Sequence, residues 1–370
     1  MLYNDLCVFN IAKIEKMIID EKYMRRCLQL ARKGLGYARP NPLVGAVIVD
    51  NDEIIGEGYH REYGKAHAEV NAVNSVKDRS RLATSTMYVS LEPCAHYGKT
   101  PPCAELIVKS GIRRVVVAAT DPNPSVAGKG LDILISAGVE VVSGVMEEEA
   151  VEQNRMFRVN QILKRPYVIL KWAQSSDGFI DRCRALGSGE NATVFSNVLS
   201  SAFVHKLRTE VQSIMVGTNT ALLDNPSLTA RNWYGQNPVR VVIDKEFKIP
   251  AGSALFNGEA ETVLISDSDC DTRHEGVKYL NVDFSSNSIS NILKALYEEG
   301  YYSVLIEGGS VLLSSFIDQN IWDEAFVEIS PLILNDGVRA PNLNIQNGCI
   351  RFFGENIQHH LKNKITQNIN

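Results

Sequence analysis

Stretches with the spacing of amphipathic helices alternate with short β-branched runs along most of this chain, and this alternation constrains the fold more than any other feature. From about residue 66 to residue 165 the pattern predicts helix, strand, helix, strand, helix, strand and helix in turn. Helices that alternate with buried strands favour an α/β domain with helices on both faces of its sheet. A second series begins at Tyr167 and does not repeat the first, so we expect two different α/β domains.

The first series is preceded by a helix and a hairpin. Asp20 is a candidate N-cap for a helix that ends near Gly34, where glycine favours helix termination. Two strand-like runs then flank Asn51 and Asp52, whose turn-forming side chains predict a β-hairpin.

The length of 370 residues agrees with two domains at roughly 100–200 residues each. The first series ends near Pro166, and the residues after about Gly348 are polar and weakly patterned, so we expect them to fray. The chain is therefore divided into four parts: an N-terminal extension over 1–19, a first domain over 20–165, a second domain over 166–347 and a polar C-terminal segment over 348–370.

Charge and cysteine content exclude several kinds of protein. Lysine and arginine total 38 against 43 aspartate and glutamate residues, a net charge of −5, which gives no general attraction to nucleic acid. No stretch approaches the ~18 apolar residues of a membrane span, and residues 1–20 lack the pattern of a signal peptide. Seven scattered cysteines are typical of reduced thiols rather than a disulfide framework. We expect a cytoplasmic protein that binds neither membranes nor nucleic acid.

One histidine and two cysteines lie within 37 residues, and each cysteine follows a proline. His67, Cys94 and Cys103 are one of the ligand sets of catalytic zinc, which commonly has three protein ligands and one open position. Proline favours the first turn of a helix, so Pro93 and Pro102 predict both thiolates near helix N-termini. There the helix dipole stabilises the anionic sulfur that binds metal.

Glu69, two residues after His67, is a candidate proton carrier beside the metal. A carboxylate next to metal-activated water can accept a proton and return it to a leaving nitrogen, which is the chemistry of hydrolytic deamination. Two other interpretations are an ordinary set of core side chains and a closed structural zinc site completed by a fourth cysteine; His96 lies close in sequence but would have to compete with solvent for the open position. The joint pattern argues against the first, and the lack of a fourth ligand at conventional spacing argues against the second.

The residues around these ligands resemble a known family. The fragments HAE and PC…C resemble the signature of the cytidine/deoxycytidylate deaminase superfamily, but eight residues separate the cysteines here instead of two. This longer spacing, with PNPLVGAVIV at 40–49, GEGYH at 56–60 and DPNPSVAGKG at 121–130, closely resembles the bifunctional riboflavin-biosynthesis deaminase/reductase family. The resemblance covers roughly residues 20–340.

The resemblance implies a fold and an activity for each domain. It implies a cytidine-deaminase-like three-layer α/β/α domain followed by a dihydrofolate-reductase-like α/β domain. The first would deaminate 2,5-diamino-6-ribosylamino-4(3H)-pyrimidinone 5′-phosphate, and the second would reduce the ribosyl group to ribityl with NADPH. By this resemblance His67, Cys94 and Cys103 bind Zn²⁺, Glu69 carries protons and Asn41 contacts the pyrimidine. We also expect a homo-oligomer.

Three stretches carry the resemblance in the second domain: SSDG at 175–178, residues 207–231 and EGG at 307–309. In EGGS the glycines allow close backbone approach to a ligand, and the N-terminus of the following helix suits a phosphate, so Gly309 and Ser310 are expected to bind cofactor. The family further implies cofactor contacts at Ala173, Thr220 and Asp224, and substrate contacts at Leu228 and Glu307.

Arg208 and Arg231 are candidates for the substrate phosphate, because forked guanidinium donors match its oxygens. The second domain departs from the family's pattern in the loop after Gly178, which is longer and places Val194 near the position where the family usually has a tryptophan.

Two alternative functions are a nucleic-acid base deaminase, and an active deaminase whose second domain binds a nucleotide without turnover. The acidic balance, the cysteine spacing and the second domain argue against a nucleic-acid substrate.

Overall fold

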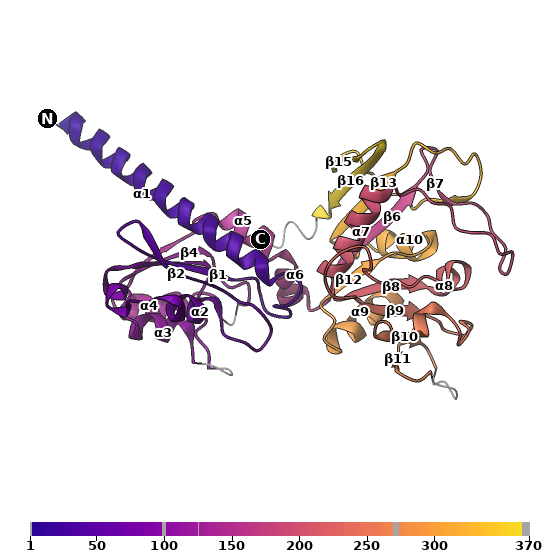
Figure 1. The fold of residues 1–370 in the computed structure, drawn as a ribbon, viewed down its shortest axis with the longest axis horizontal. Coiled ribbons are helices and arrows are strands. Elements are labelled where there is room, and N and C mark those ends of the chain that lie inside the picture. The colour runs from indigo at the N-terminus through magenta and orange to yellow at the C-terminus, as the bar shows by residue number, and fades with distance from the viewer. Residues whose placement is uncertain (1, 98–100, 125, 269–273, 365–370) are drawn as a thin grey trace. The chain divides into compact units, whose positions relative to one another are not determined.

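The computed structural model describes residues 2–97, 101–124, 126–268 and 274–364. The chain divides into two compact units, Met1–Ile162 and Leu163–Asn370, each built around its own sheet (Figure 1). No helix in the described ranges is both long and apolar enough to cross a lipid bilayer.

The first unit contains a five-stranded sheet in the order β2-β1-β3-β4-β5, in which β1 is antiparallel to both neighbours and the remaining pairs are parallel. Its strands are β1 Gly45–Asp50, β2 Glu53–Tyr59, β3 Thr86–Leu91, β4 Arg114–Ala119 and β5 Glu140–Ser143. The predicted hairpin is confirmed. Asn51 and Asp52 form the β1-β2 turn with φ of 49° and 61°, a conformation that these two residue types tolerate.

Helices cover both faces of this sheet, as predicted. Side chains alternate along β1, so Val47 belongs to a core with α1 and α5, whereas Ile48 belongs to a core with α2, α3 and α4. The helices are α1 Leu2–Ala31, α2 Ala68–Ser75, α3 Cys103–Lys109, α4 Lys129–Ser136, α5 Glu147–Gln153 and α6 Arg155–Leu163, with short 3₁₀ turns at η1 Arg32–Gly34 and η2 Arg79–Thr84.

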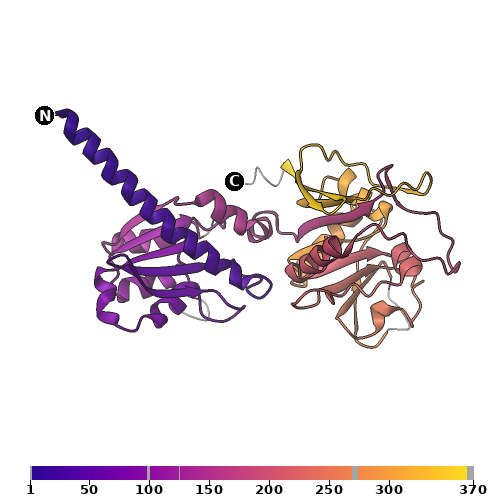
Figure 2. The ribbon, with the colours of Figure 1, turned by 45° about the horizontal axis from the view of Figure 1, so that its top comes forward.

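Helix α1 begins at Leu2, so the predicted helix start at Asp20 is wrong. Residues 2–19 contain neither glycine nor proline, and nothing in them stops the helix from continuing toward the N-terminus, where it extends beyond the sheet (Figure 2). Asp20 has a different role. Its buried carboxylate accepts hydrogen bonds from Arg114 at 2.8 and 3.0 Å and from the Tyr88 hydroxyl at 2.9 Å, which fixes α1 on the sheet.

The last helix of the first series is interrupted. The sequence predicts one helix over residues 147–164, but Asn154 separates α5 from α6. The Asn154 side chain accepts a hydrogen bond from the Leu43 backbone N–H at 2.8 Å and donates to the Leu43 carbonyl at 3.0 Å. This contact with a distant segment overrides a locally continuous helical pattern.

The second unit contains a nine-stranded sheet in the order β11-β10-β9-β8-β12-β6-β13-β16-β15. It is parallel from β11 to β13 and antiparallel from β13 through β16 to β15. The strands are β6 Tyr167–Gln174, β8 Ser213–Gly217, β9 Val239–Ile243, β10 Thr262–Ser266, β11 Val277–Asn281, β12 Ser303–Ile306, β13 Glu324–Ile329, β15 Cys349–Phe353 and β16 Asn356–Lys362. A separate small sheet pairs β7 Phe179–Asp181 with β14 Val338–Arg339.

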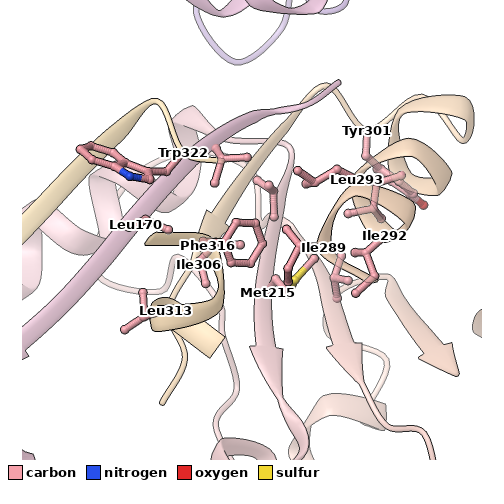
Figure 3. Close-up of a cluster of buried hydrophobic side chains, with 14 of the residues drawn as sticks. Leu170, Met215, Ile289, Ile292, Leu293, Tyr301, Ile306, Leu313, Phe316 and Trp322 are labelled. Carbon is pink, nitrogen blue, oxygen red and sulfur yellow. The ribbon is translucent and has the colours of Figure 1, made fainter. Parts of the chain in front are cut away.

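Apolar side chains pack between this sheet and its helices. Met215 and Phe316 are fully buried in a cluster that also contains Ile292 and Leu293 (Figure 3). The helices are α7 Val198–Glu210, α8 Thr218–Asp224, α9 Ser288–Glu298 and α10 Ser310–Asp318, with a 3₁₀ turn at η3 Ala254–Phe256. Because the central strands are parallel, their carboxyl ends share one edge of the sheet, which is where α/β proteins bind ligands.

The C-terminal segment forms strands β15 and β16 of this sheet, so the prediction that it frays after Gly348 is wrong for the described residues. Burial along β16 alternates only from Asn356 to Gln358 before Leu361, and those first two buried residues are polar, at 5% and 1% exposure. Hydrophobic alternation is therefore weak although the strand is paired on both sides. Residues 365–370 lie outside the described part of the chain.

Candidate active sites

The structure brings together His67, Cys94 and Cys103 in the first unit. His67 is the N-cap residue of α2, Cys103 is the first residue of α3, and Cys94 lies in the loop after β3. The sulfur atoms of Cys103 and Cys94 lie 3.3 and 3.6 Å from His67 Nδ1, and the three donor atoms lie within 4.8 Å of one another.

This donor set fits zinc. With Zn–S and Zn–N bonds of about 2.3 and 2.0–2.1 Å in a tetrahedral site, neighbouring sulfur and nitrogen ligands are about 3.6 Å apart. The two sulfur–nitrogen separations of 3.3 and 3.6 Å match this value. Among the described residues no fourth histidine, cysteine or acidic ligand joins the cluster, so its composition is that of a catalytic site rather than a closed structural one.

The surroundings of the two sulfurs favour a thiolate at Cys94, while the hydrogen bond with Cys94 and burial raise the pKa of the Cys103 thiol. Hydrogen bonds with the Cys103 side chain and with His67 lower the pKa of the Cys94 thiol, against the opposing effect of burial. Cys94 does not begin a helix of its own. Its sulfur instead accepts the backbone N–H of Cys103 at 3.3 Å, so both sulfurs meet at the N-terminus of α3.

Glu69 lies in the first turn of α2 and is only 3% exposed. Burial raises the pKa of its carboxyl to about 7, and the neighbouring Cys94 sulfur adds to the shift. A carboxyl whose pKa lies near neutral pH can both accept and release a proton during turnover. Its position beside the metal ligands agrees with the predicted role of proton carrier.

Asn41 is linked to the metal ligand His67 by way of His60. Asn41 Nδ2 lies 3.0 Å from His60 Nε2, and the rings of His60 and His67 meet edge to face with centroids 5.5 Å apart. Because an amide nitrogen donates, His60 Nε2 accepts and its Nδ1 donates to the Ala66 carbonyl at 3.2 Å. Burial lowers the pKa of His60, which supports this neutral form. His60 was visible in the sequence only as part of GEGYH, where nothing distinguished its role.

Glu92 ties the turn that carries Cys94 to a second loop. Its buried carboxylate accepts the backbone N–H groups of Asp121 at 3.1 Å, Gly128 at 3.0 Å and Gly130 at 2.9 Å. These three residues belong to the DPNPSVAGKG stretch, and a side chain at Gly130 would collide with the Pro93 carbonyl. The stretch is therefore held against the segment that precedes a metal ligand.

A cavity of about 790 Å³ lies in the second unit at the carboxyl ends of its parallel strands. Its volume is in the range of small-molecule binding sites. All five residues that the sequence predicts as cofactor contacts line it: Ala173, Thr220, Asp224, Gly309 and Ser310. The turn between β12 and α10 is fixed at this cavity, because the Gly309 N–H donates to Thr220 Oγ1 at 2.9 Å.

The predicted substrate residues of the second unit divide into two groups. Glu307 lines the cavity, whereas Arg208, Leu228 and Arg231 lie outside its lining. Arg208 nevertheless contacts Glu307 through two donors at 3.1 and 2.7 Å and binds the Thr229 carbonyl at 2.8 Å. Although burial opposes it, this guanidinium holds the pKa of Glu307 below its usual value.

Several cavity residues were missed by the sequence analysis. Lys171 is one of them, and the sequence signal for it was a charged residue between the apolar neighbours Leu170 and Trp172. Arg184 is another: it forms ion pairs with Asp181 and with the predicted cofactor residue Asp224, and its side chain is 4% exposed. The stretch from Ala192 to Ser196 also lines the cavity, within the loop that departs from the family's pattern.

Two family models match the chain in the same order as its units. The model described as cytidine and deoxycytidylate deaminase zinc-binding region matches residues 17–119. The model described as RibD C-terminal domain matches residues 166–349.

Whole-length relatives agree with both matches. The riboflavin biosynthesis protein RibD of Aquifex aeolicus is 40% identical over 89% of this chain and 92% of its own length, and that of Bacillus amyloliquefaciens is 40% identical over 88% of each. A crystal structure from Thermotoga maritima covers 94% of this chain and 99% of its own, with 34% identity and a TM-score of 0.84. It is described as a diaminohydroxyphosphoribosylaminopyrimidine deaminase/5-amino-6-(5-phosphoribosylamino)uracil reductase.

Proposed function

The chain belongs to the riboflavin biosynthesis protein RibD family of bifunctional deaminase/reductases, and from this premise we propose that it catalyses two consecutive reactions of riboflavin biosynthesis. The first is hydrolytic deamination of 2,5-diamino-6-ribosylamino-4(3H)-pyrimidinone 5′-phosphate. The second is reduction of the ribosyl side chain to ribityl with NADPH. The cluster of His67, Cys94 and Cys103 beside the buried Glu69 is the observation that carries the proposal.

In the first unit, His67, Cys94 and Cys103 would hold Zn²⁺, which supplies a Lewis acid that activates water at neutral pH. Glu69 takes a proton at a carboxylate oxygen and delivers it to the departing amino group. Burial, which raises the pKa of this carboxyl in the metal-free chain, favours its uptake of that proton. Asn41, oriented by its hydrogen bond with His60, binds the edge of the pyrimidine.

In the second unit, NADPH supplies a hydride for the sugar carbon. Ala173, Thr220, Asp224, Gly309 and Ser310 bind the cofactor in the cavity, with the start of α10 directed at a phosphate.

The substrate contacts of the second unit are Glu307, Leu228, Arg208 and Arg231. Glu307 and Arg208 act as a pair, in which Arg208 keeps the carboxylate ionised and in place. The donors of Arg208 that do not contact Glu307 or Thr229, together with Arg231, bind the substrate phosphate.

A coupled assay with the purified chain tests both reactions. With the diaminopyrimidine phosphate alone, ammonia is released. When NADPH is added, its absorbance at the nicotinamide band falls in step with the deaminated product. Absence of ammonia release refutes the deaminase assignment, and persistent NADPH absorbance in the presence of an active deaminase reduces the second unit to a binding module.

We also propose that the chain forms a homo-oligomer. Ile350 and Phe352 on the edge strand β15 and Val198 and Leu199 at the start of α7 are each more than half exposed. An apolar edge strand is a ready surface for pairing with a second copy. Light scattering of the wild-type chain and of Phe352→Ser tests this, with a lower mass expected for the variant.

Two further proposals concern location and domain limits. A cytoplasmic location would keep the cysteine ligands reduced. The functional domains are proposed to span 20–165 and 166–347, with α1 extending the first domain over 2–19 and β15 and β16 completing the sheet of the second after residue 347. Assays of each domain expressed alone would test these limits.

A further inference from the structure

We propose that Asn356, the first residue of β16 in the C-terminal hairpin, is a positioning residue for the reductase cofactor site. Asn356 positions the cofactor by binding the part of the cavity wall that Phe195 and Ser196 form. We call these contacts the hairpin latch, defined by Asn356 and Glu328 on one side and Phe195, Ser196 and Asn197 on the other. The proposal rests on the assignment of the second unit as an NADPH-dependent reductase.

The wall is an irregular stretch with few means of fixing itself. Phe195 and Ser196 line the cavity, and they lie between β7 and α7 in a stretch without helix or strand. Backbone of this kind keeps one conformation only where other groups bind it. The contacts that it makes with the rest of the unit therefore decide the shape of the cavity.

Glu328 in β13 supplies the first of these contacts. It is completely buried, and its two carboxylate oxygens accept from Ser196 Oγ at 2.6 Å and from Asn356 Nδ2 at 2.5 Å. In the sheet Glu328 pairs with Ala173 of β6, a cavity residue. The carboxylate thus joins the wall, the C-terminal hairpin and the floor of the cavity.

Asn356 completes the connection. Its Nδ2 also donates to the Phe195 carbonyl at 2.9 Å, so one amide group binds both the wall and the buried carboxylate. On the opposite side of the hairpin turn, Asn197 Nδ2 donates to the Phe353 carbonyl at 2.5 Å, while Asn197 Oδ1 caps α7. The wall is therefore bound to the hairpin on both sides of Ser196.

Most of this hairpin lies beyond the part of the chain that the RibD C-terminal domain model matches, which ends at residue 349. Loss of the Asn356 amide leaves a buried carboxylate oxygen and a backbone carbonyl without their donor. The wall can then move away from the cofactor, while the proposed cofactor contacts Ala173 in β6 and Thr220 and Asp224 in α8 keep their places.

The test compares Asn356→Ala with Asn363→Ala in the full chain. Asn363 is a matched control, because it is equally buried on the same C-terminal segment and donates to Asn320 Oδ1 at 2.7 Å and to the Trp322 carbonyl at 2.9 Å, away from the cavity. The dissociation constant of NADPH is measured by nucleotide fluorescence, together with the reductase KM and kcat, the melting temperature and ammonia release.

We expect Asn356→Ala to weaken NADPH binding about tenfold, because the cofactor must then order a wall that these hydrogen bonds no longer fix, and to raise KM while kcat at saturation stays near the wild-type value. Asn363→Ala is expected to lower the melting temperature without changing the NADPH dissociation constant. Ammonia release stays unchanged in both variants. Equal NADPH affinity of Asn356→Ala and wild type, or equal weakening in both variants, overturns the proposal.

Trypsin cleavage separates this proposal from the proposed function. Arg182, which is exposed, and Arg184 precede the wall in the same loop. Cleavage after them should be faster in Asn356→Ala than in Asn363→Ala, with or without cofactor. If wild type fails to bind NADPH, the reductase assignment is refuted, and the cleavage rates alone decide whether the latch holds the wall.

Discussion

Replacing Glu69 by glutamine tests the deaminase chemistry with a change of a single charged group. The amide has nearly the same size, so the buried position in α2 and the zinc ligands are preserved. It cannot accept and return a proton. General acid–base catalysis contributes typically 10²–10⁴-fold, so we expect ammonia release to fall by about that factor while zinc content stays at the wild-type value.

The same variant has a predicted effect on the stability of the metal-free chain. The pKa of Glu69 rises from 4.5 to about 7 on folding, which at 1.36 kcal/mol per pKa unit amounts to about 3 kcal/mol. Below pH 4.5 both the folded and the unfolded state hold the proton. Between pH 4.5 and about 7 only the folded state holds it, so the free energy of unfolding decreases as the pH rises. Glu69→Gln has no carboxyl to titrate at this position, so its free energy of unfolding does not show this decrease.

Denaturant unfolding of the metal-free proteins measures the effect. The three tryptophans, at positions 172, 233 and 322, all belong to the second unit, so their fluorescence reports the unfolding of that unit. Circular dichroism reports both units. The part of its change that does not coincide with the fluorescence change therefore reports the first unit. We expect the variant to gain about 3 kcal/mol over wild type between pH 4.5 and pH 8. Identical pH dependence of the two proteins, or full ammonia release by the variant, refutes the reasoning.

Three further predictions concern the ligands and the buried ion pair. Cys103→Ser should reduce zinc content to well below one ion per chain, measured by equilibrium dialysis, and abolish ammonia release while NADPH still binds. Arg208→Met leaves Glu307 buried without its partner and should destabilise the second unit by about 3–5 kcal/mol, measured by tryptophan fluorescence; unchanged stability would contradict the pairing. Because Arg208 lowers the pKa of Glu307, its stabilisation is complete above the ordinary glutamate pKa and is lost as the pH falls through the lower folded value. Glu307→Gln should therefore flatten the acid dependence of stability below pH 4.5, measured by the same fluorescence unfolding.

The sequence predicted the features that depend on local chemistry. The alternation of strands and helices, the hairpin at Asn51 and Asp52 and the grouping of His67 with two cysteines all follow from residue type and spacing. Ala173, Thr220 and Asp224 could be found only from the resemblance to a family, and the EGGS motif that indicates Gly309 and Ser310 is weak alone. Their meeting in one cavity depends on the order of parallel strands, which spacing does not give.

The wrong predictions share a physical cause. At Asp20, at Asn154 and along β16, polar side chains bind groups far away in the sequence. Sequence rules that use only neighbouring residues assign such residues to helix caps, helix interiors or exposed positions. Their partners, Arg114, Leu43 and Glu328, are known only once the chain has folded.

Metal analysis of the chain, purified without chelator, combined with X-ray absorption at the zinc edge, tests the central claim most directly. We expect one zinc ion per chain with two sulfur atoms and one imidazole nitrogen among its nearest neighbours, from Cys94, Cys103 and His67. A chain without stoichiometric transition metal, or a zinc ion bound by four sulfur or nitrogen atoms of the protein, would contradict it.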